Sequence, residues 1–277
     1  MRQIITALLG ATVLSIVCAP AALAADMPVK APVYKAPVAI APSWTGFYIG
    51  GHAGYGWSRA STQEVGLGTI LVIPAQTVGA LPTSLSPRVS GFVGGGQLGY
   101  NWQSGQYVTG LELDISYSGL RGDDALIAPV IGGNPPLTTT QSNRIDWLGT
   151  VRGRLGWLVA PSILIYGTGG LAYGGVMAST TIVVPTPPGT CPAGSAFCSV
   201  GSQSATRAGW TVGAGLESAI SSNWTVKLEY LYFNLGTLSY PVIVTSTGTF
   251  GGTTDMMASA KFDGQIVRVG LNYKFGQ

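Results

Sequence analysis

Apolar and polar residues alternate one by one along much of the chain. In residues 144–160, RIDWLGTVRGRLGWLVA, the odd positions from 145 to 159 hold only apolar residues or glycine, whereas three arginines occupy even positions. Because successive side chains of a β-strand point to opposite faces, this segment predicts a strand with one apolar face and one charged face. Such a strand is typical of a wall between an apolar surrounding and a polar interior.

Eight segments with strand character follow one another from residue 45 onward. They lie at 45–57, 90–103, 106–118, 144–159, 163–177, 207–219, 224–236 and 262–275. Short connections at 104–105, 160–162 and 220–223 alternate with long ones at 58–89, 119–143, 178–206 and 237–261. Outer-membrane barrels show this asymmetry between periplasmic turns and extracellular loops. The sequence therefore predicts an all-β fold, an eight-stranded antiparallel up-and-down transmembrane β-barrel with periplasmic termini and long extracellular loops.

The seven tryptophans fall at two levels of these predicted strands. Trp44, Trp102, Trp157 and Trp224 lie beside short connections, and Trp57, Trp147 and Trp210 lie beside long ones. Ten residues separate Trp147 from Trp157, which at a tilt near 40° is about 25 Å along the membrane normal. We expect these residues to form the two aromatic girdles of a membrane-spanning barrel.

Charged residues lie opposite the large apolar residues in the strands that carry both. A charge that faces lipid at the bilayer midplane costs about 2–4 kcal/mol, so we expect the charged faces to point into the lumen. The predicted lumen residues are Glu112, Asp114, Arg152, Arg154, Glu217, Lys227, Glu229 and Arg268. They can fill the lumen as a paired network or line a pore, and the narrow interior of eight strands favours the filled lumen.

Two other interpretations of the chain stay open. Residues 155–206 carry no charge, and part of that span has the apolar content of a transmembrane helix. Six glycines and Pro161 between residues 155 and 184 argue against a helix there and favour two strands. A soluble secreted β-protein is the second alternative, but it gives no reason for short and long connections to alternate.

The N-terminus has the features of an export signal. Arg2 precedes an apolar run from Ile4 to Val17, and Ala22-Leu23-Ala24 forms a small-x-small cleavage site. We expect residues 1–24 to be a removed signal peptide. Residues 25–43 contain the unit KAPV twice and predict a Pro/Ala-rich periplasmic linker. The barrel domain is expected at 44–277.

Composition limits the chemistry that the chain can support. Only 9% of residues are charged, and the net charge of +3 is too small and too dispersed to indicate a nucleic-acid partner. Cys191 and Cys198 remain after removal of the signal and predict a disulfide in an oxidising compartment. His52 is the single histidine, so we expect no metal site, no cofactor and no enzyme; its predicted strand places it in the lumen as part of a polar network.

Four stretches resemble, in order, a known family. They are WTGFYIGGHAGYGW, DWLGTVRGRLGW followed by ILIYGTGGLAYG, GWTVGAGLESAISSNWTVKLEYLYF, and VRVGLNYKF. They resemble the small outer-membrane β-barrel proteins of α-proteobacteria, the outer-membrane immunogenic or porin-like surface antigens, which are related in architecture to the outer-membrane protein A barrel. The resemblance covers most of residues 44–275. It implies an eight-stranded barrel, surface exposure and no catalytic residues.

The resemblance also suggests partners and a function. Such barrels usually end on an aromatic residue that the barrel-assembly machinery recognises, whereas here Gly276 and Gln277 follow Phe275. We expect outer-membrane lipids and this machinery as partners, and host or cell-surface ligands at the long loops. The expected function is a role in envelope integrity and surface contact with a plugged lumen; the alternative is a porin-like channel for small solutes or ions.

Overall fold

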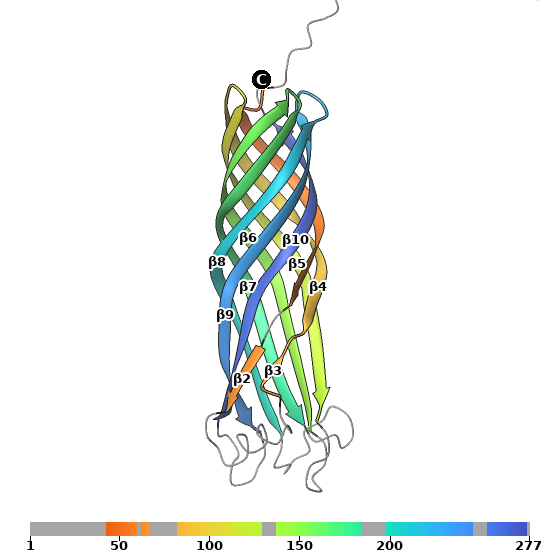
Figure 1. Cartoon of the computed structure of the whole chain (residues 1–277), viewed down its shortest axis with the longest axis vertical. Coiled ribbons are helices and arrows are strands. Elements are labelled where there is room, and N and C mark those ends of the chain that lie inside the picture. The colour runs from red at the N-terminus through yellow and green to blue at the C-terminus, as the bar shows by residue number, and fades with distance from the viewer. Residues whose placement is uncertain are drawn as a thin grey trace, which may run out of the picture. The chain divides into compact units, whose positions relative to one another are not determined.

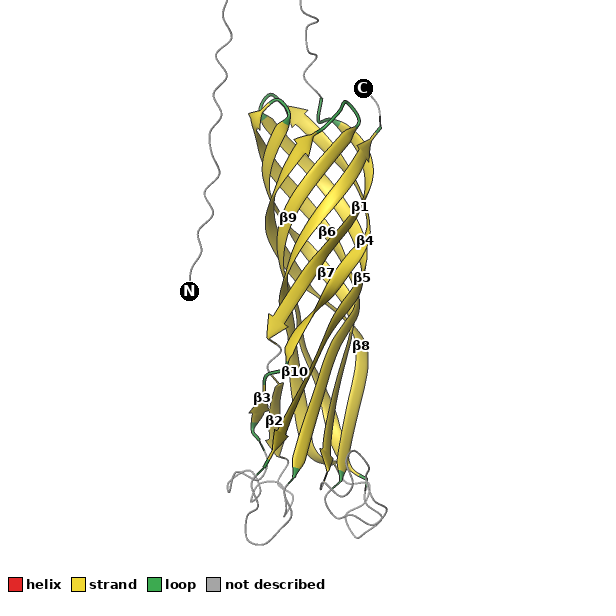
Figure 2. Cartoon of the chain, turned by 90° about the vertical axis from the view of Figure 1, so that its right-hand side faces the viewer, coloured by secondary structure: helices red, strands yellow, loops and turns green. Residues whose placement is uncertain are grey.

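The described residues form one β-barrel. The computed structural model describes residues 43–59, 62–66, 82–128, 137–183, 198–245 and 254–275, and these residues contain strands and turns (Figures 1 and 2). The strands are β1 Gly46–Arg59, β2 Thr62–Gly66, β3 Ser84–Leu85, β4 Arg88–Ser104, β5 Tyr107–Ile127, β6 Thr138–Ala160, β7 Ile163–Val183, β8 Ser199–Ala219, β9 Trp224–Val244 and β10 Thr254–Lys274. No helix long and apolar enough to cross a membrane occurs among these residues. The predicted signal peptide and nearly all of the predicted linker lie outside them.

The barrel closes through its first and last long strands. β1 pairs with β4 on one side and with β10 on the other, and every neighbouring pair is antiparallel. β1 and β4 to β10 therefore form a ring of eight strands in chain order. The predicted all-β, eight-stranded antiparallel barrel is confirmed.

The strands are longer than the sequence predicts. β5, β7 and β9 run on to Ile127, Val183 and Val244, and β6, β8 and β10 begin at Thr138, Ser199 and Thr254. Much of the predicted long connections is therefore barrel wall. The alternation continues in these extensions, but most outward residues are polar or small and the inward residues are mostly apolar, with polar exceptions such as Gln141 and Asn143. The extensions therefore have few of the large outward apolar residues by which the strands were recognised.

Two short strands lie within the predicted connection 58–89. β2 pairs with residues Met256–Ala260 of β10, beyond the last pair that β10 forms with β1, Trp57 with Gln265. β3 in turn pairs with β2. β2 thus continues the wall on the side of β10 where β1 has already ended.

The short turns gather at one end of the barrel. Gly105, with φ of +60°, lies in the two-residue turn between β4 and β5, a conformation that glycine adopts at little cost. The turn before β9 contacts the end of β10, since Lys274 N donates to Asn223 O. Figure 1 shows the C-terminal end of the chain beside these turns. The opposite ends of the strands lead to residues 129–136, 184–197 and 246–253.

Candidate functional site: the barrel lumen

All eight charged residues that the sequence assigns to the lumen lie inside the barrel. They come from β5, β6, β8, β9 and β10, and none is more than 5% exposed. Inward glycines leave room for the long cations, because a Cβ at Gly110 would lie 3.1 Å from Cγ of Arg154, and one at Gly270 would lie 3.0 Å from Cε of Lys227. The strand period and these glycines together fit the network into a narrow interior.

Two arginines form the centre of the network. Arg152 donates to Glu112, to Asp114 Oδ2 at 2.9 Å and to Glu229 Oε1 at 3.0 Å. Arg268 donates to Asp114 Oδ2 at 3.1 Å and to Glu229 Oε2 at 2.7 Å. Two guanidinium groups from β6 and β10 therefore bridge three carboxylates from β5 and β9 across the lumen.

The other two cations bind nearer the short turns. Lys227 Nζ donates to both carboxylate oxygens of Glu112 at 2.8 Å, and Arg154 Nη2 donates to Glu217 Oε2 at 2.6 Å. The Arg154 guanidinium also lies 4.1 Å from the centre of the Tyr166 ring. With these contacts four carboxylates face four cations, so the formal charges of the predicted set cancel.

Uncharged polar side chains complete the network, and the sequence analysis did not select them. Each is buried and faces inward from its strand, so strand parity is the signal that could have found them. Their bonds, between 2.6 and 3.0 Å long, run from Tyr48 to Glu112, from Thr150 to Asp114, from Tyr166 to Glu229 and from Asn272 to Glu217. The carboxylates thus receive neutral donors as well as cations, which buried charges require.

His52 lies in the lumen beside the network. Its Nε2 lies 2.7 Å from Ser116 Oγ and 3.2 Å from Arg268 Nη1. Within the described residues its Nδ1 has no hydrogen-bond partner. A Ser-His pair is therefore present without a carboxylate to orient the imidazole, and an arginine contacts the same nitrogen that a catalytic serine would use.

Trp44 does not belong to an aromatic girdle, contrary to the sequence-based expectation. It is only 2% exposed and packs inside the short-turn end of the barrel against Val108, Leu158 and Leu164. Its Nε1 donates to Pro161 O at 3.1 Å. Trp44 precedes β1, so strand alternation does not fix its direction, and the chain here folds into the mouth of the barrel and covers it.

The other six tryptophans lie on the outer surface at two levels. Five of them, Trp57, Trp102, Trp157, Trp210 and Trp224, are 40–49% exposed. Trp147 is partly covered by the ring of Tyr173, with 5.9 Å between ring centres. We call the wall between these levels, typified by Tyr107–Tyr117 of β5 and Trp147–Trp157 of β6, the membrane zone.

Beyond the membrane zone the barrel continues with its polarity reversed. We call this part, typified by residues 118–127 of β5 and 138–146 of β6, the outer zone. Its interior contains an apolar core that includes Leu120, Ile145, Val176, Ala178, Phe233, Leu235, Tyr240, Val242, Met256, Ala258 and Phe262. Polar Thr139, Gln141, Asn143 and Thr180 are buried beside this core. The outward residues of the outer zone are mostly polar and include Arg121, Thr140, Arg144, Ser239, Ser259 and Lys261.

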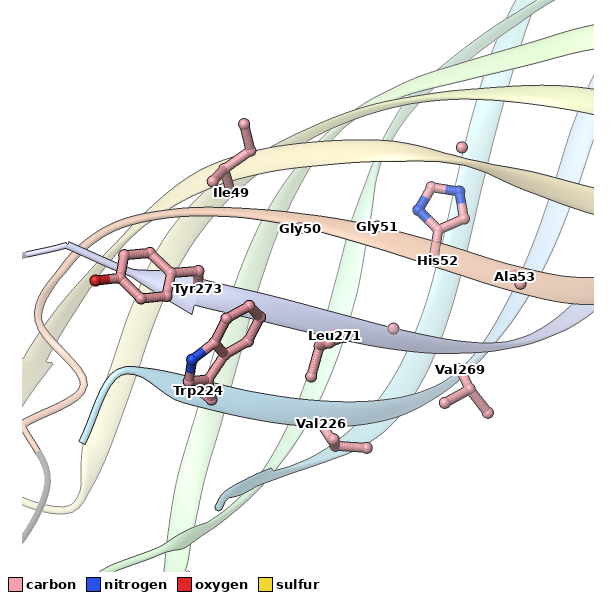
Figure 3. Close-up of a pocket in the computed structure, with 12 residues that line it drawn as sticks. Ile49, Gly50, Gly51, His52, Ala53, Trp224, Val226, Val269, Leu271 and Tyr273 are labelled. Carbon is pink, nitrogen blue, oxygen red and sulfur yellow. The ribbon is translucent and has the colours of Figure 1, made fainter. Parts of the chain in front are cut away.

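The outer surface of the membrane zone carries an apolar groove. A cavity of about 880 Å³ lies along β1, β9 and β10, and Figure 3 shows Ile49, Trp224, Leu271 and Tyr273 among its lining residues. Ile49, Trp224 and Leu271 are exposed on the outside of the barrel. The groove therefore belongs to the outer surface of the wall and not to the lumen.

Two further sequence predictions concern a disulfide and metal binding. Cys198 is buried, but Cys191 lies outside the described residues, so their disulfide stays a prediction. In the described part of the chain, no three His, Cys, Asp or Glu side chains gather as metal ligands.

Comparison with known proteins identifies the family. The model of the outer membrane protein beta-barrel domain matches residues 9–275. The chain is 36% identical to the 31 kDa outer-membrane immunogenic protein of Brucella melitensis, over 93% of this chain and 95% of that protein. It is 32% identical to the 22 kDa outer membrane protein of Rhizobium leguminosarum, over 87% of this chain and 82% of that one.

Among solved structures, the outer membrane protease OmpT of Escherichia coli covers 85% of this chain at 10% identity and a TM-score of 0.42, with 99% of its own chain matched. This similarity is too low to support an argument. The match of the family domain and the identity to the Brucella protein do not depend on it. The chain belongs to the outer membrane protein β-barrel family, and its relatives include an outer-membrane immunogenic protein of Brucella melitensis.

Proposed function

We propose that this protein is a closed surface barrel, which contributes to envelope integrity and contacts the surroundings of the cell but does not conduct solutes. The observation that carries the proposal is the occupation of the lumen at three successive levels. Trp44 and its apolar neighbours cover the short-turn end, the ion-paired network fills the membrane zone, and the apolar core fills the outer zone.

The chemistry of the network supports closure. An eight-stranded barrel has room for little more than its own side chains. The guanidinium of Arg152 is fully buried among three carboxylates, and an open path for ions would have to break such contacts. Breaking one partner of a buried ion pair is costly, so thermal fluctuation alone would seldom open the lumen.

We further propose that the short turns and both termini lie in the periplasm, with the long connections outside the cell. The alternation of turn lengths supports this orientation. Phe275 is exposed and packs edge to face against Tyr273, with 5.1 Å between the ring centres, and it then presents an outward aromatic group that the barrel-assembly machinery can recognise. Epitope tags in 129–136, 184–197 or 246–253 should be accessible on intact cells, and tags at Ser221 should not.

The lumen does not favour catalysis. A hydrolase of the Ser-His-acid type needs an oriented base and an accessible nucleophile. Ser116 and His52 are both buried inside the barrel, and His52 has no carboxylate partner among the described residues. We therefore place both residues in the structural network.

Single-channel conductance tests the proposal against the porin-like alternative. The refolded full-length protein is inserted into a planar bilayer, and a general porin serves as the positive control. We expect no conductance steps. Reproducible steps that vanish when the protein is omitted would establish the channel and overturn the closed barrel.

A further inference from the structure

Two arginines lie side by side on the outer surface, just beyond the membrane zone. Arg121 of β5 and Arg144 of β6 are direct cross-strand partners and both point outward. Arg121 follows Tyr117 by four residues, and Arg144 precedes Trp147 by three. Aromatic belts mark the level of the lipid headgroups, so both guanidinium groups lie at or just above that level.

The arrangement leaves positive charge without a matching protein group. Like charges directly opposite each other on neighbouring strands destabilise a sheet. Asp146 lies 3.4 Å from Arg144, but within the described part of the chain no acid comes within ion-pair distance of Arg121. Arg88 and Asp123 are also exposed here, so the five groups together carry one net positive charge. A bound anion would relieve the repulsion between the two arginines.

An apolar groove lies below these arginines in the same wall. A cavity of about 420 Å³ is lined mainly by outward residues of β1, β4, β5 and β7, among them Ile49, Gly96, Leu98, Leu113, Ile115 and Tyr173. Leu113 lies eight residues from Arg121 on β5, about 26 Å along the strand. On β5, Leu113 lies four residues from Tyr117 at the belt, and on β1, Ile49 lies eight residues from Trp57, so the groove occupies the middle of the membrane zone.

Gly96 keeps the groove open although the fold does not require a glycine there. A Cβ at Gly96 would meet only Gly50 O, at 3.8 Å, an ordinary contact distance. A larger side chain is therefore sterically possible at Gly96 and would project into the groove. The groove along β1, β9 and β10 has no such cations at its end near Trp224 and Tyr273, because no described outward residue there is charged.

We propose that this wall binds a phosphate-bearing membrane lipid, whose phosphate lies between Arg121 and Arg144 and whose acyl chain lies in the groove over Gly96. Arginine guanidinium groups suit phosphate oxygens, and basic residues beside a membrane attract anionic headgroups. One molecule can meet both features only if it joins an anionic group to a hydrocarbon chain, which identifies a lipid. The inference does not depend on whether the lumen is closed.

Retention of phosphatidylglycerol on the full-length protein tests the proposal. The protein is folded in micelles that contain equal amounts of phosphatidylglycerol and phosphatidylcholine, and native mass spectrometry counts the lipids that stay bound. Arg121→Gln with Arg144→Gln removes the cations, and Lys261→Gln, which removes an exposed cation on β10, is the control. Gly96→Leu fills the groove. Gly153→Leu is its control, because Gly153 is also exposed, with its nearest atom at 3.9 Å from an added Cβ.

We expect the wild type to retain one phosphatidylglycerol in preference to phosphatidylcholine, and each removed arginine to lower retention about fivefold. Gly96→Leu should also lower retention, whereas both control variants should resemble the wild type. Equal retention of the two lipids, or an unchanged preference in the double arginine variant, would overturn the proposal. So would displacement of the lipid by millimolar inorganic phosphate, since that would identify a site for a free anion. If Gly96→Leu does not fold, the comparison of the double arginine variant with its cation control still decides between the outcomes.

Discussion

The membrane zone and the outer zone belong to the same barrel wall but carry their large apolar residues on opposite sides. These residues face outward, toward lipid, in the membrane zone and inward, toward the core, in the outer zone. In the membrane zone, outward Val151 and Leu155 flank inward Arg152 and Arg154. In the outer zone, outward Ser239 lies between inward Leu238 and Tyr240. The backbone pairing of β5, β6, β7 and β8 continues across the boundary, whereas β1 ends there and β8 and β9 form no pairs between Val200 and Trp210. The outward residues of the same strands therefore face lipid in one zone and water in the other. Apolar burial holds the outer zone together, as in a soluble protein, whereas ion pairs fill the inside of the membrane zone.

The largest expected effect concerns a single buried arginine. Arg152→Ala leaves Glu112, Asp114 and Glu229 without their shared partner, and removing one member of a buried pair costs about 3–5 kcal/mol. Arg144→Ala on the same strand removes a pair that is 45% exposed at the arginine and should cost about 0–1 kcal/mol. Urea titration in lipid vesicles measures both. Equal stability of the two variants would contradict the inward network.

The second prediction compares two leucines of β9. Leu235 is fully buried in the core of the outer zone, and Leu235→Ala should cost about 2–5 kcal/mol. Leu228 is exposed on the outside of the membrane zone, where lipid replaces the lost contacts, so Leu228→Ala should cost much less. The same titrations give the comparison. A larger loss at Leu228 would mean that the boundary between the zones is misplaced.

The third prediction places a new charge on the outside of each zone. Val151→Arg directs a guanidinium at lipid and should cost about 2–4 kcal/mol. Ser239→Arg does the same on the polar outside of the outer zone and should change stability by only about 0.5 kcal/mol. The yield of folded protein in vesicles, followed by urea titration, distinguishes the two. Tolerance of both arginines would show that Val151 does not face lipid.

The last prediction is a pH dependence of the outer zone. Burial raises the pKa of Glu64, on β2, to about 7 from its ordinary value of 4.5. The folded state therefore keeps a proton that the unfolded state loses, and stability should fall as the pH rises from about 4.5 to 7. Glu64→Gln should remove this slope, whereas Asp123→Asn, at an exposed site on β5, should keep it. Urea titrations at pH 5 and pH 8 compare the variants, and identical slopes would exclude Glu64 as the cause.

The contrast between the zones also explains which parts of the molecule the sequence could predict. Lipid allows almost no charge on the outside, so parity alone assigned Glu112, Arg152 and the other six charged residues to the inside. In the outer zone the outside faces water, so charge is not excluded from it and parity cannot be assigned in this way. Small polar residues outside and Ala258 or Ala260 inside produce a weak alternation that resembles a loop. For that reason the strand ends were missed although every long strand was found.

The predictions for single residues were wrong or incomplete for a different reason. Trp44 lies before the first strand, and only the folded barrel shows that the chain turns into its mouth. Tyr48, Thr150 and Tyr166 join the network through neutral hydroxyl groups, and the prediction missed them because it selected charged residues only, although strand parity directs all three inward. Which acid meets which cation depends on register across several strands. A sequence without an alignment of relatives does not specify that register.

The outer zone sets the height at which the tips of the barrel meet their surroundings. From Trp147 to Thr138, β6 runs nine residues beyond the aromatic level, about 30 Å of strand and roughly 20–25 Å perpendicular to the membrane at a tilt near 40°. The connections after β5, β7 and β9 therefore start from a stiff stalk and not from the bilayer surface. In the orientation proposed above, a large molecule that approaches the cell would reach these connections before it reaches the lipid headgroups, and substitutions in them should leave the membrane zone unchanged.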